Sequence, residues 1–189
     1  MSELEAEKVT GVGRNKFLML VAIAFTPIAI SYLTYFFMPG WIPTSTTNEG
    51  AFMSPPLELG ERLDLSGKWE LLMAPASNCN AECKQALVNA RQVHISLNKN
   101  TPRLVRRIIL AEPAPESLSG YLGAEHAGVE VIVNPTLYKD LVSRSAVAGM
   151  TALYLMDPNG NVILFYVGDK TGKPMLKDMK HLMKLSNIG

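Results

Sequence analysis

The sequence predicts an α/β domain, with a mixed β-sheet flanked by helices, preceded by one transmembrane helix. Two observations lead to this prediction: a single long apolar run close to the N-terminus, and an alternation of strand and helix patterns along the remaining chain. The 189 residues carry 18 basic and 17 acidic side chains, a formal net charge of +1. Because this balance leaves no broad basic field for a phosphate backbone, we expect no nucleic acid among the partners.

Residues 17–38 form the apolar run and contain no charged side chain. As a helix they would extend about 33 Å, enough to cross a hydrocarbon core of roughly 30 Å. The run is longer than the core of a cleaved signal peptide, which has about 7–15 residues, and it ends without a small-x-small cleavage pattern. We therefore expect an uncleaved anchor that contacts membrane lipid through one helix.

The charges on either side of the run indicate its orientation. Lys8, Arg14 and Lys16 precede it, and no Lys or Arg follows until Arg62. The positive-inside rule then keeps residues 1–16 in the cytoplasm and places the rest of the chain across the membrane. In a bacterium, this arrangement is a single-pass inner-membrane protein with its C-terminal domain in the periplasm.

The segment after the anchor, residues 39–61, holds several prolines and no regular apolar period. This composition predicts a periplasmic tether with little structure. The folded domain is expected over residues 62–189. Its first unit is a buried strand at 68–73, followed by a loop and a helix at 82–97, for which Asn78 or Asn80 is the candidate N-cap.

Further apolar patterns predict the later elements. Asp157-Pro158-Asn159-Gly160 is a strong turn signal that joins two apolar runs into a hairpin. Predicted strands cover residues 105–110, 129–133, 152–156 and 162–167, and predicted helices cover 135–142 and 174–185. The helix at 82–97 is long enough to make the strands before and after it parallel. This order of elements is that of a thioredoxin-like sheet.

Two cysteines, Cys79 and Cys83, fall between the first strand and its helix. Within one helix their β-carbons would lie about 5–6 Å apart, farther than the roughly 3.5–4.5 Å of a disulfide, so Cys79 is expected before the helix and Cys83 in its first turn. The helix dipole there favours a thiolate, whereas the neighbouring Glu82 opposes it. Three chemistries stay open: binding of Cu(I) by soft thiolates, thiol–disulfide exchange, and a permanent bridge that only staples the loop.

A family resemblance rests on the cysteine pair and three other segments. These segments are Gly67-Lys68-Trp69-Glu70-Leu71-Leu72-Met73, Asn100-Thr101-Pro102 and Tyr154-Leu155-Met156-Asp157-Pro158-Asn159-Gly160. With the single N-terminal anchor, they resemble the SCO family of membrane-anchored, thioredoxin-like copper chaperones for cytochrome c oxidase assembly, over about residues 63–185. The resemblance implies copper as Cu(I) on two cysteines and a histidine, redox exchange with partner thiols, and an oxidase subunit or another assembly factor as partner.

The chain departs from the SCO pattern in two places. Asn80 and Lys84 stand where the family's cysteine motif carries prolines, and Gly149 stands where the family has its histidine ligand. His94 lies about 16 Å from Cys83 along the same predicted helix, too far to share an ion with that thiolate.

Three other side chains are weighed as a third copper ligand. His126 lies in a Gly-rich loop that could move, and His181 is expected on the surface of the last helix. Met150 has a thioether soft enough for Cu(I), although methionine in such a place is more often core filler. We expect a site of two thiols only, with Cys79 and Cys83 serving either Cu(I) binding or thiol–disulfide exchange.

Other features of the sequence indicate no further activity. No P-loop, dinucleotide fingerprint, HExxH motif or serine nucleophile elbow is present in the sequence. A short basic cluster near a strand start is expected to form a solvated face: Arg103, Arg106 and Arg107.

Three functional hypotheses follow. The first is an SCO-like assembly factor for a haem–copper oxidase that handles Cu(I) or partner thiols through Cys79 and Cys83. The second is a periplasmic thiol–disulfide oxidoreductase in which Cys79 attacks and Cys83 resolves. The third is a non-catalytic adaptor with a degenerate metal site. Loss of the family histidine at Gly149 favours the second and third hypotheses.

Overall fold

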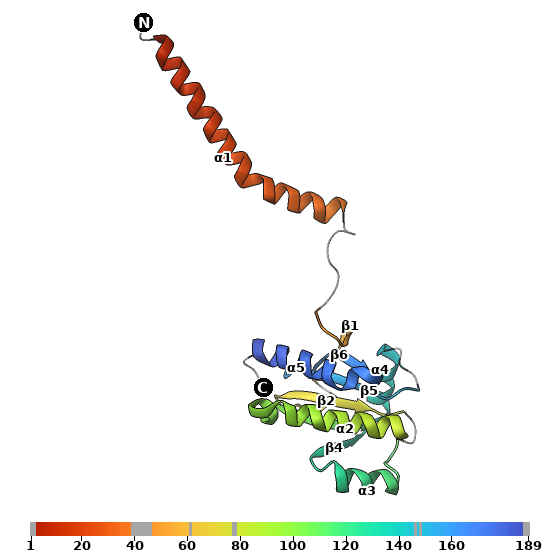
Figure 1. Cartoon of the computed structure of the whole chain (residues 1–189). Helices are drawn as coiled ribbons and strands as arrows, with labels where there is room; N and C mark the ends of the chain where they lie inside the picture. Colours follow the sequence, from red (N-terminus) through yellow and green to blue (C-terminus); the bar gives the residue numbers. More distant parts are fainter. Residues whose placement is uncertain are drawn as a thin grey trace. The chain divides into compact units, whose positions relative to one another are not determined.

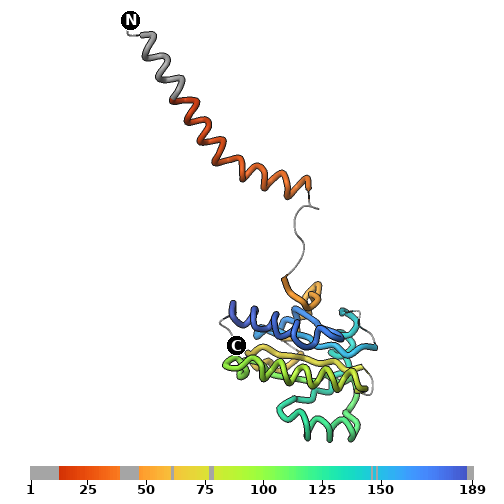
Figure 2. The backbone as a smooth tube through the Cα atoms, in the orientation of Figure 1, coloured from red at the N-terminus to blue at the C-terminus, as the bar shows by residue number. Residues whose placement is uncertain are grey.

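The computed structural model describes residues 3–38, 47–60, 62–76, 79–145, 147 and 149–186. The chain divides into two compact units, Met1–Thr46 and Thr47–Gly189. Figure 1 shows the helices and strands of both units, and Figure 2 follows the same backbone as a tube.

The described part of the first unit forms one helix, α1 (Glu3–Phe37). Its segment Gly13–Phe37 has 25 residues and a mean hydropathy of 2.0, and it is long and apolar enough to cross a membrane. Thr26 donates its hydroxyl to the carbonyl oxygen of Ala22 at 2.6 Å, which satisfies a polar group that lipid could not. The predicted run at 17–38 is therefore confirmed as one candidate span, while its orientation and its membrane stay predictions.

The second unit is built on one mixed sheet with the strand order β1-β6-β5-β2-β3-β4. The strands are β1 (Ala51–Glu58), β2 (Trp69–Ala74), β3 (Leu104–Leu110), β4 (Val129–Val133), β5 (Ala152–Met156) and β6 (Asn161–Val167). β2, β3 and β4 run parallel to one another, whereas the pairs β2 with β5, β5 with β6 and β6 with β1 are antiparallel. The predicted mixed sheet and its parallel first pair are confirmed.

Helices cover both faces of this sheet (Figure 1). They are α2 (Ala81–Ser96), α3 (Glu116–Glu125), α4 (Pro135–Ser145) and α5 (Lys173–Leu185), with short 3-10 helices at Asn98–Arg103 and Gly168–Thr171. α2, α3 and α5 pack on one face, and α4 packs on the other. Leu71 of β2 belongs to the first core and Leu72 to the second, because successive side chains of a strand point to opposite faces.

The predicted hairpin between β5 and β6 is present. The Asp157 carboxylate accepts hydrogen bonds from the backbone N–H groups of Asn159 and Asn161 at 2.9 and 2.8 Å. Gly160 has a φ of +88°, and a β-carbon there would lie 3.1 Å from the backbone nitrogen of Gly60. Both the turn conformation and the close approach therefore require glycine at this position.

Strand β1 corrects the expected tether. Its eight residues lie inside segment 39–61, so the expectation of little structure is wrong for them. Pro55 and Pro56 argued against a strand, but β1 is an edge strand whose register shifts between Phe52 and Leu57, where missing N–H donors are tolerated. Residues 39–46 of the expected tether lie outside the described residues.

Helix α3 was not predicted from the sequence. It contains two glycines and buries only Leu118 and Leu122, so its apolar period is too weak to stand out. The expectation of a solvated basic cluster is also wrong, since Arg106 and Arg107 are each only 8% exposed. The reason is pairing between parts of the chain that lie far apart in sequence. Arg107 forms an ion pair with the buried carboxylate of Glu70, and Arg106 donates to the carbonyl oxygen of Ala127 at 3.3 Å.

Candidate functional site

Cys79 and Cys83 form a disulfide at the start of α2. Their Cα atoms lie 4.9 Å apart, within the range that a disulfide spans. Cys79 precedes the helix and Cys83 lies in its first turn, as the spacing predicted. Asn80 is the N-cap, and its side-chain oxygen accepts a hydrogen bond from the backbone N–H of Cys83 at 3.1 Å. Asn78, the other candidate cap, lies outside the described residues.

The two sulfur-bearing residues differ in exposure and backbone conformation. Cys83 is 0% exposed and belongs to the core beneath α2, whereas Cys79 is 8% exposed. Cys79 also has a φ of +28°, in a region that side chains other than glycine rarely adopt. Such conformations persist only where the surrounding structure holds them, and they concentrate at functional sites.

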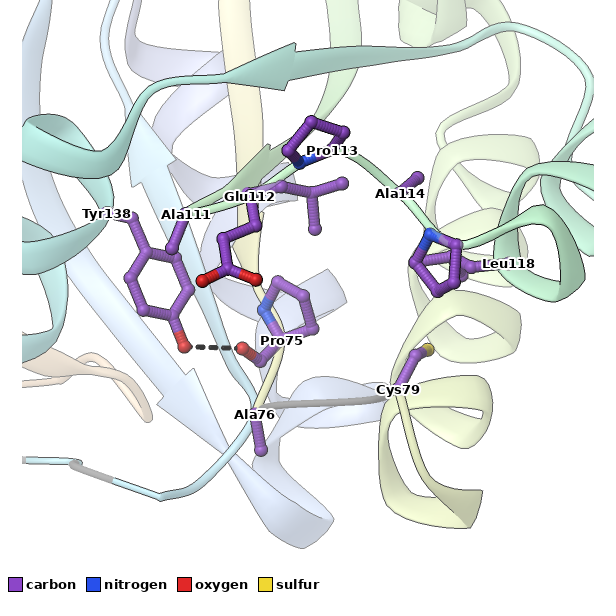
Figure 3. A pocket seen from close by; sticks show the side chains of 11 residues that line it. Pro75, Ala76, Cys79, Ala111, Glu112, Pro113, Ala114, Leu118 and Tyr138 are labelled. Carbon is purple, nitrogen blue, oxygen red and sulfur yellow. Dashed lines mark hydrogen bonds between the residues drawn. The ribbon is translucent and has the colours of Figure 1, made fainter.

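A cleft of about 270 Å³ opens beside Cys79. Its walls come from the ends of β2 and β3, the start of α3 and one side chain of α4: Pro75, Ala76, Cys79, Leu110, Ala111, Glu112, Pro113, Ala114, Pro115, Leu118 and Tyr138. Figure 3 shows the Glu112 carboxylate pointing into this cleft between Tyr138 and Pro75. The cleft is therefore mainly apolar with one carboxylate, and of the two cysteines only Cys79 lines it.

Tyr138 fixes one wall of the cleft. Its hydroxyl donates a hydrogen bond to the carbonyl oxygen of Pro75 at 2.6 Å (Figure 3). Burial raises the pKa of Tyr138 above its ordinary value, so the hydroxyl keeps its proton and stays a donor at neutral pH. This bond joins α4 to the segment that leads from β2 to Cys79.

The turn before β5 lies against the same segment. Thr151 accepts a hydrogen bond from the backbone N–H of Ala76 at 3.2 Å. Gly149 in this turn has a φ of +79°, a conformation that a histidine would adopt only with strain. The neighbouring Met150 is 42% exposed rather than part of the core. The position that holds the histidine ligand in the SCO family is therefore a glycine in this chain, and its backbone has a positive φ that favours glycine.

The histidines lie elsewhere in the second unit. His94 contacts the carbonyl oxygen of Leu104 at 3.2 Å, and burial, followed by the charge of Arg106, lowers its pKa. His126, which was weighed as a third ligand and not expected to be one, is 2% exposed, and its Nε2 lies 3.1 Å from the Tyr121 hydroxyl. Burial, followed by the charge of Arg106, lowers the pKa of His126 too.

The residues present do not fit the three-ligand copper site that the SCO resemblance implies. Within the described residues, no group of three His, Cys, Asp or Glu side chains could hold a metal ion. In the disulfide form neither sulfur is a thiolate ligand, and reduction would supply two thiolates, Cys79 and Cys83. The expected Cu(I) site is therefore limited to these two sulfurs.

The strand order, the helices on both faces and the cysteine pair at the start of α2 define a thioredoxin-like domain. A family model described as "Transmembrane-like, thioredoxin-like, C-terminal domain" matches residues 69–186. The chain belongs to this family. A search of curated proteins finds no match.

Solved structures similar to this chain include SCO proteins and a thiol:disulfide interchange protein. Copper-bound ScoI from Arabidopsis thaliana is 16% identical, with 62% of this chain and 87% of that chain covered and a TM-score of 0.46. An SCO1/SenC family lipoprotein from Bacillus anthracis is 18% identical, with 71% and 91% covered and a TM-score of 0.47. A putative thiol:disulfide interchange protein DsbE from Chlorobium tepidum is 17% identical, with 74% and 100% covered and a TM-score of 0.47. Likeness at this level carries no conclusion about activity.

Sequence reasoning found the cysteines but missed the cleft beside them. Glu112, Pro113, Pro115 and Tyr138 were not singled out, because no spacing joins a loop after β3 to a helix more than twenty residues later. One signal was available: a proline-rich segment with a carboxylate directly follows a parallel strand, and functional loops gather at the carboxyl ends of such strands.

Proposed function

We propose that this protein is a membrane-anchored thiol–disulfide exchange protein, with Cys79 as the sulfur that meets client thiols and Cys83 as its internal partner. The asymmetry between the two cysteines is the observation that carries this proposal. Cys79 lines an open cleft, whereas Cys83 is fully buried. A bridge that only stapled the loop would not need a cleft of about 270 Å³ against one of its two sulfurs.

The exchange takes place in two balanced steps. A client thiolate attacks the sulfur of Cys79, the Cys79–Cys83 bond breaks, and Cys83 leaves as a thiolate. A second client thiol, once deprotonated, attacks the client sulfur of this mixed disulfide and releases Cys79 as a thiolate. The client is then oxidised by two electrons and the protein is reduced by two. The reverse sequence reduces a client disulfide, with Cys79 attacking and Cys83 resolving.

The start of α2 stabilises the leaving sulfur. Cys83 lies in the first turn, where the positive end of the helix dipole favours a thiolate. Glu82 in the same turn opposes this effect, so the reactivity of the pair is set by two competing charges. Oxidation of a client does not require a cation beside the pair, because in that direction Cys79 is attacked and does not have to be ionised beforehand.

The test uses the full chain in nanodiscs and a peptide that carries an internal disulfide, which the Cys79 thiolate of a single-cysteine variant can attack. The Cys83→Ser variant should accumulate a mixed disulfide between the peptide and Cys79, detected as an added mass, because no internal thiol releases the client. The matched Cys79→Ser variant should accumulate far less, since its remaining thiol is buried. Equal trapping by both variants, or by neither, would sink the proposal. The reduction potential of the wild-type pair should lie well above about −300 mV.

A second candidate function keeps the SCO-like hypothesis. One observation favours it: the turn with the exposed Met150 thioether is hydrogen-bonded, through Thr151, to the segment that leads to Cys79. Under this proposal the reduced protein carries Cu(I) as cargo between Cys79 and Cys83 to an oxidase subunit or another assembly factor. Titration of the reduced chain should then give one tight Cu(I) equivalent, which the Cys79→Ala/Cys83→Ala variant lacks.

The third possibility is a non-catalytic adaptor, in which the cysteines neither bind copper nor exchange disulfides. In that case the double alanine variant would still co-purify with an oxidase subunit as well as the wild type does. The proposed location for all three roles is a bacterial inner membrane, with residues 1–16 in the cytoplasm and the second unit in the periplasm. Labelling of exposed lysines from each side of sealed membranes tests this orientation.

A further inference from the structure

The exposed side of α5 carries a stripe of lysines. Lys173, Lys177, Lys180 and Lys184 follow one another at helical spacing, and all four are exposed. Three methionines occupy the opposite side of the same helix and are buried in the core: Met175, Met179 and Met183. α5 is therefore a basic amphipathic helix whose apolar side packs in the core of the domain.

Little negative charge faces this stripe. The acidic residue of α5, Asp178, is 5% exposed, and its carboxylate accepts hydrogen bonds from Glu49 N, Gly50 N and the Tyr166 hydroxyl. The Glu49 carboxylate pairs with Lys177 at 2.6 Å. Within the residues that the structure describes, the other three lysines of the stripe form no ion pair, and His181 adds a further exposed ring beside them.

An apolar groove of about 670 Å³ runs along α5 beside the stripe. Its apolar lining comes from β1, β6 and α5 and includes Phe52, which is 55% exposed. Lys177, Lys180 and Lys184 form its basic rim. An exposed aromatic ring next to several lysines is the combination that binds at a membrane surface, where the ring enters the headgroup layer and the lysines meet its charge.

The covalent chain keeps this face close to the lipid. Thr47, which lines the groove, is separated from Met38 at the end of the candidate span by residues 39–46. Even fully extended, this connection reaches no more than about 32 Å. With α1 inserted in a membrane, the lipid surface is therefore present at a high effective concentration for the groove, which is not true of a soluble partner.

We propose that the basic face of α5, defined as Lys173, Lys177, Lys180, Lys184 and the adjoining groove with Phe52, docks on anionic phospholipid headgroups of the membrane that anchors α1. The groove and the cleft beside Cys79 share no lining residue. This inference does not depend on the chemistry of the cysteines.

The test compares lysine acylation rates in the full chain reconstituted in two kinds of nanodisc. One contains phosphatidylcholine only, and the other contains about 30% phosphatidylglycerol. Acylation of the α5 stripe should slow at least about threefold in the anionic discs and recover at about 0.5 M salt, where charges are screened within a few ångströms. Three exposed lysines away from α5 should keep their rates and serve as internal controls: Lys68, Lys99 and Lys139.

Two matched variants separate docking from general charge attraction. Lys180→Glu/Lys184→Glu and Lys68→Glu/Lys99→Glu change the net charge equally and alter only exposed side chains. Only the first should abolish the slowing at Lys173 and Lys177. The proposal is overturned if acylation of the stripe is not slower in anionic discs, and binding of an acidic protein to the stripe would not rescue it. It is also overturned if both variants lose the slowing of acylation to the same extent.

Discussion

The Glu70 carboxylate of β2 and the Arg107 guanidinium of β3 form an ion pair of 2.6 Å inside the sheet. Glu70 is 0% exposed and Arg107 is 8% exposed. Ser66 also donates to Glu70 at 2.7 Å, and Arg107 also donates to the carbonyl oxygen of Asp64 at 2.9 Å and pairs with the exposed carboxylate of Glu130 at 2.7 Å. The pair ties the strand that leads to Cys79 to its parallel neighbour.

Removing one partner of this pair should be costly. Arg107→Met leaves the Glu70 carboxylate buried without its cation, and we expect a loss of about 3–5 kcal/mol in the free energy of unfolding. Glu70→Leu/Arg107→Met should lose clearly less than the sum of the single variants, because no uncompensated buried charge remains; the other carboxylate that pairs with Arg107, Glu130, is 58% exposed. Urea denaturation of the full chain in detergent measures both values.

The exposed ion pair between Arg62 and Asp140 provides the control. Asp140→Asn removes a charge from a pair whose side chains are 49% and 35% exposed, so the expected change is about 0–1 kcal/mol. A loss for Arg107→Met no larger than this control would show that the buried pair is not an important part of the sheet's stability.

Asp178 clamps the start of the second unit to α5. Its carboxylate accepts from two backbone N–H groups of Glu49 and Gly50, at 2.8 and 2.9 Å, and from the Tyr166 hydroxyl at 3.1 Å. Asp178→Asn replaces one acceptor oxygen by a donor and should cost about 2–3 kcal/mol, whereas Tyr166→Phe removes one bond and should cost about 1–2 kcal/mol. Hydrogen exchange should show residues 49 and 50 losing protection first in Asp178→Asn. Unchanged exchange there would contradict the clamp.

Two buried tyrosines predict a loss of stability at alkaline pH. Burial raises the pKa of Tyr154 to about 12, and burial followed by the charge of Asp178 raises the pKa of Tyr166. In the unfolded chain both titrate near pH 10, so their contribution is complete below about pH 10 and falls as the pH rises further, by about 1.4 kcal/mol per pH unit for each tyrosine.

Denaturation curves between about pH 8 and 12 test this sign. The wild type should be stable up to about pH 10 and then lose stability steeply. Tyr154→Phe should be less stable at pH 8, because its bond to Ser145 is lost, but its stability should fall less above pH 10. A wild-type curve that stays level to pH 12 would mean that neither phenol is held protonated by the fold.

The sequence was most informative where covalent geometry or strong periodicity decides the outcome. Cysteine spacing placed Cys79 before the helix and Cys83 within it, and the turn signal at residues 157–160 located the hairpin. It was least informative where tertiary pairing decides. Strand β1 was not predicted because it contains two prolines, which are tolerated at a sheet edge. Arg107 was expected on the surface because its buried partner, Glu70, lies far away in the sequence.

Reduction of the Cys79–Cys83 disulfide should change stability only modestly. The closed loop contains few residues, so the bridge removes little entropy from the unfolded chain, worth about 2 kcal/mol in the loop-closure model. Cys83 remains packed in the core whether oxidised or reduced, because a thiol behaves there as a small apolar group. We therefore expect the reduced wild type to lose about 2 kcal/mol or less in the free energy of unfolding and to stay folded. The Cys79→Ala/Cys83→Ala variant should resemble it, apart from a small cavity cost. Loss of the fold on reduction alone would identify the bridge as a structural staple and remove the basis for thiol–disulfide exchange at this site.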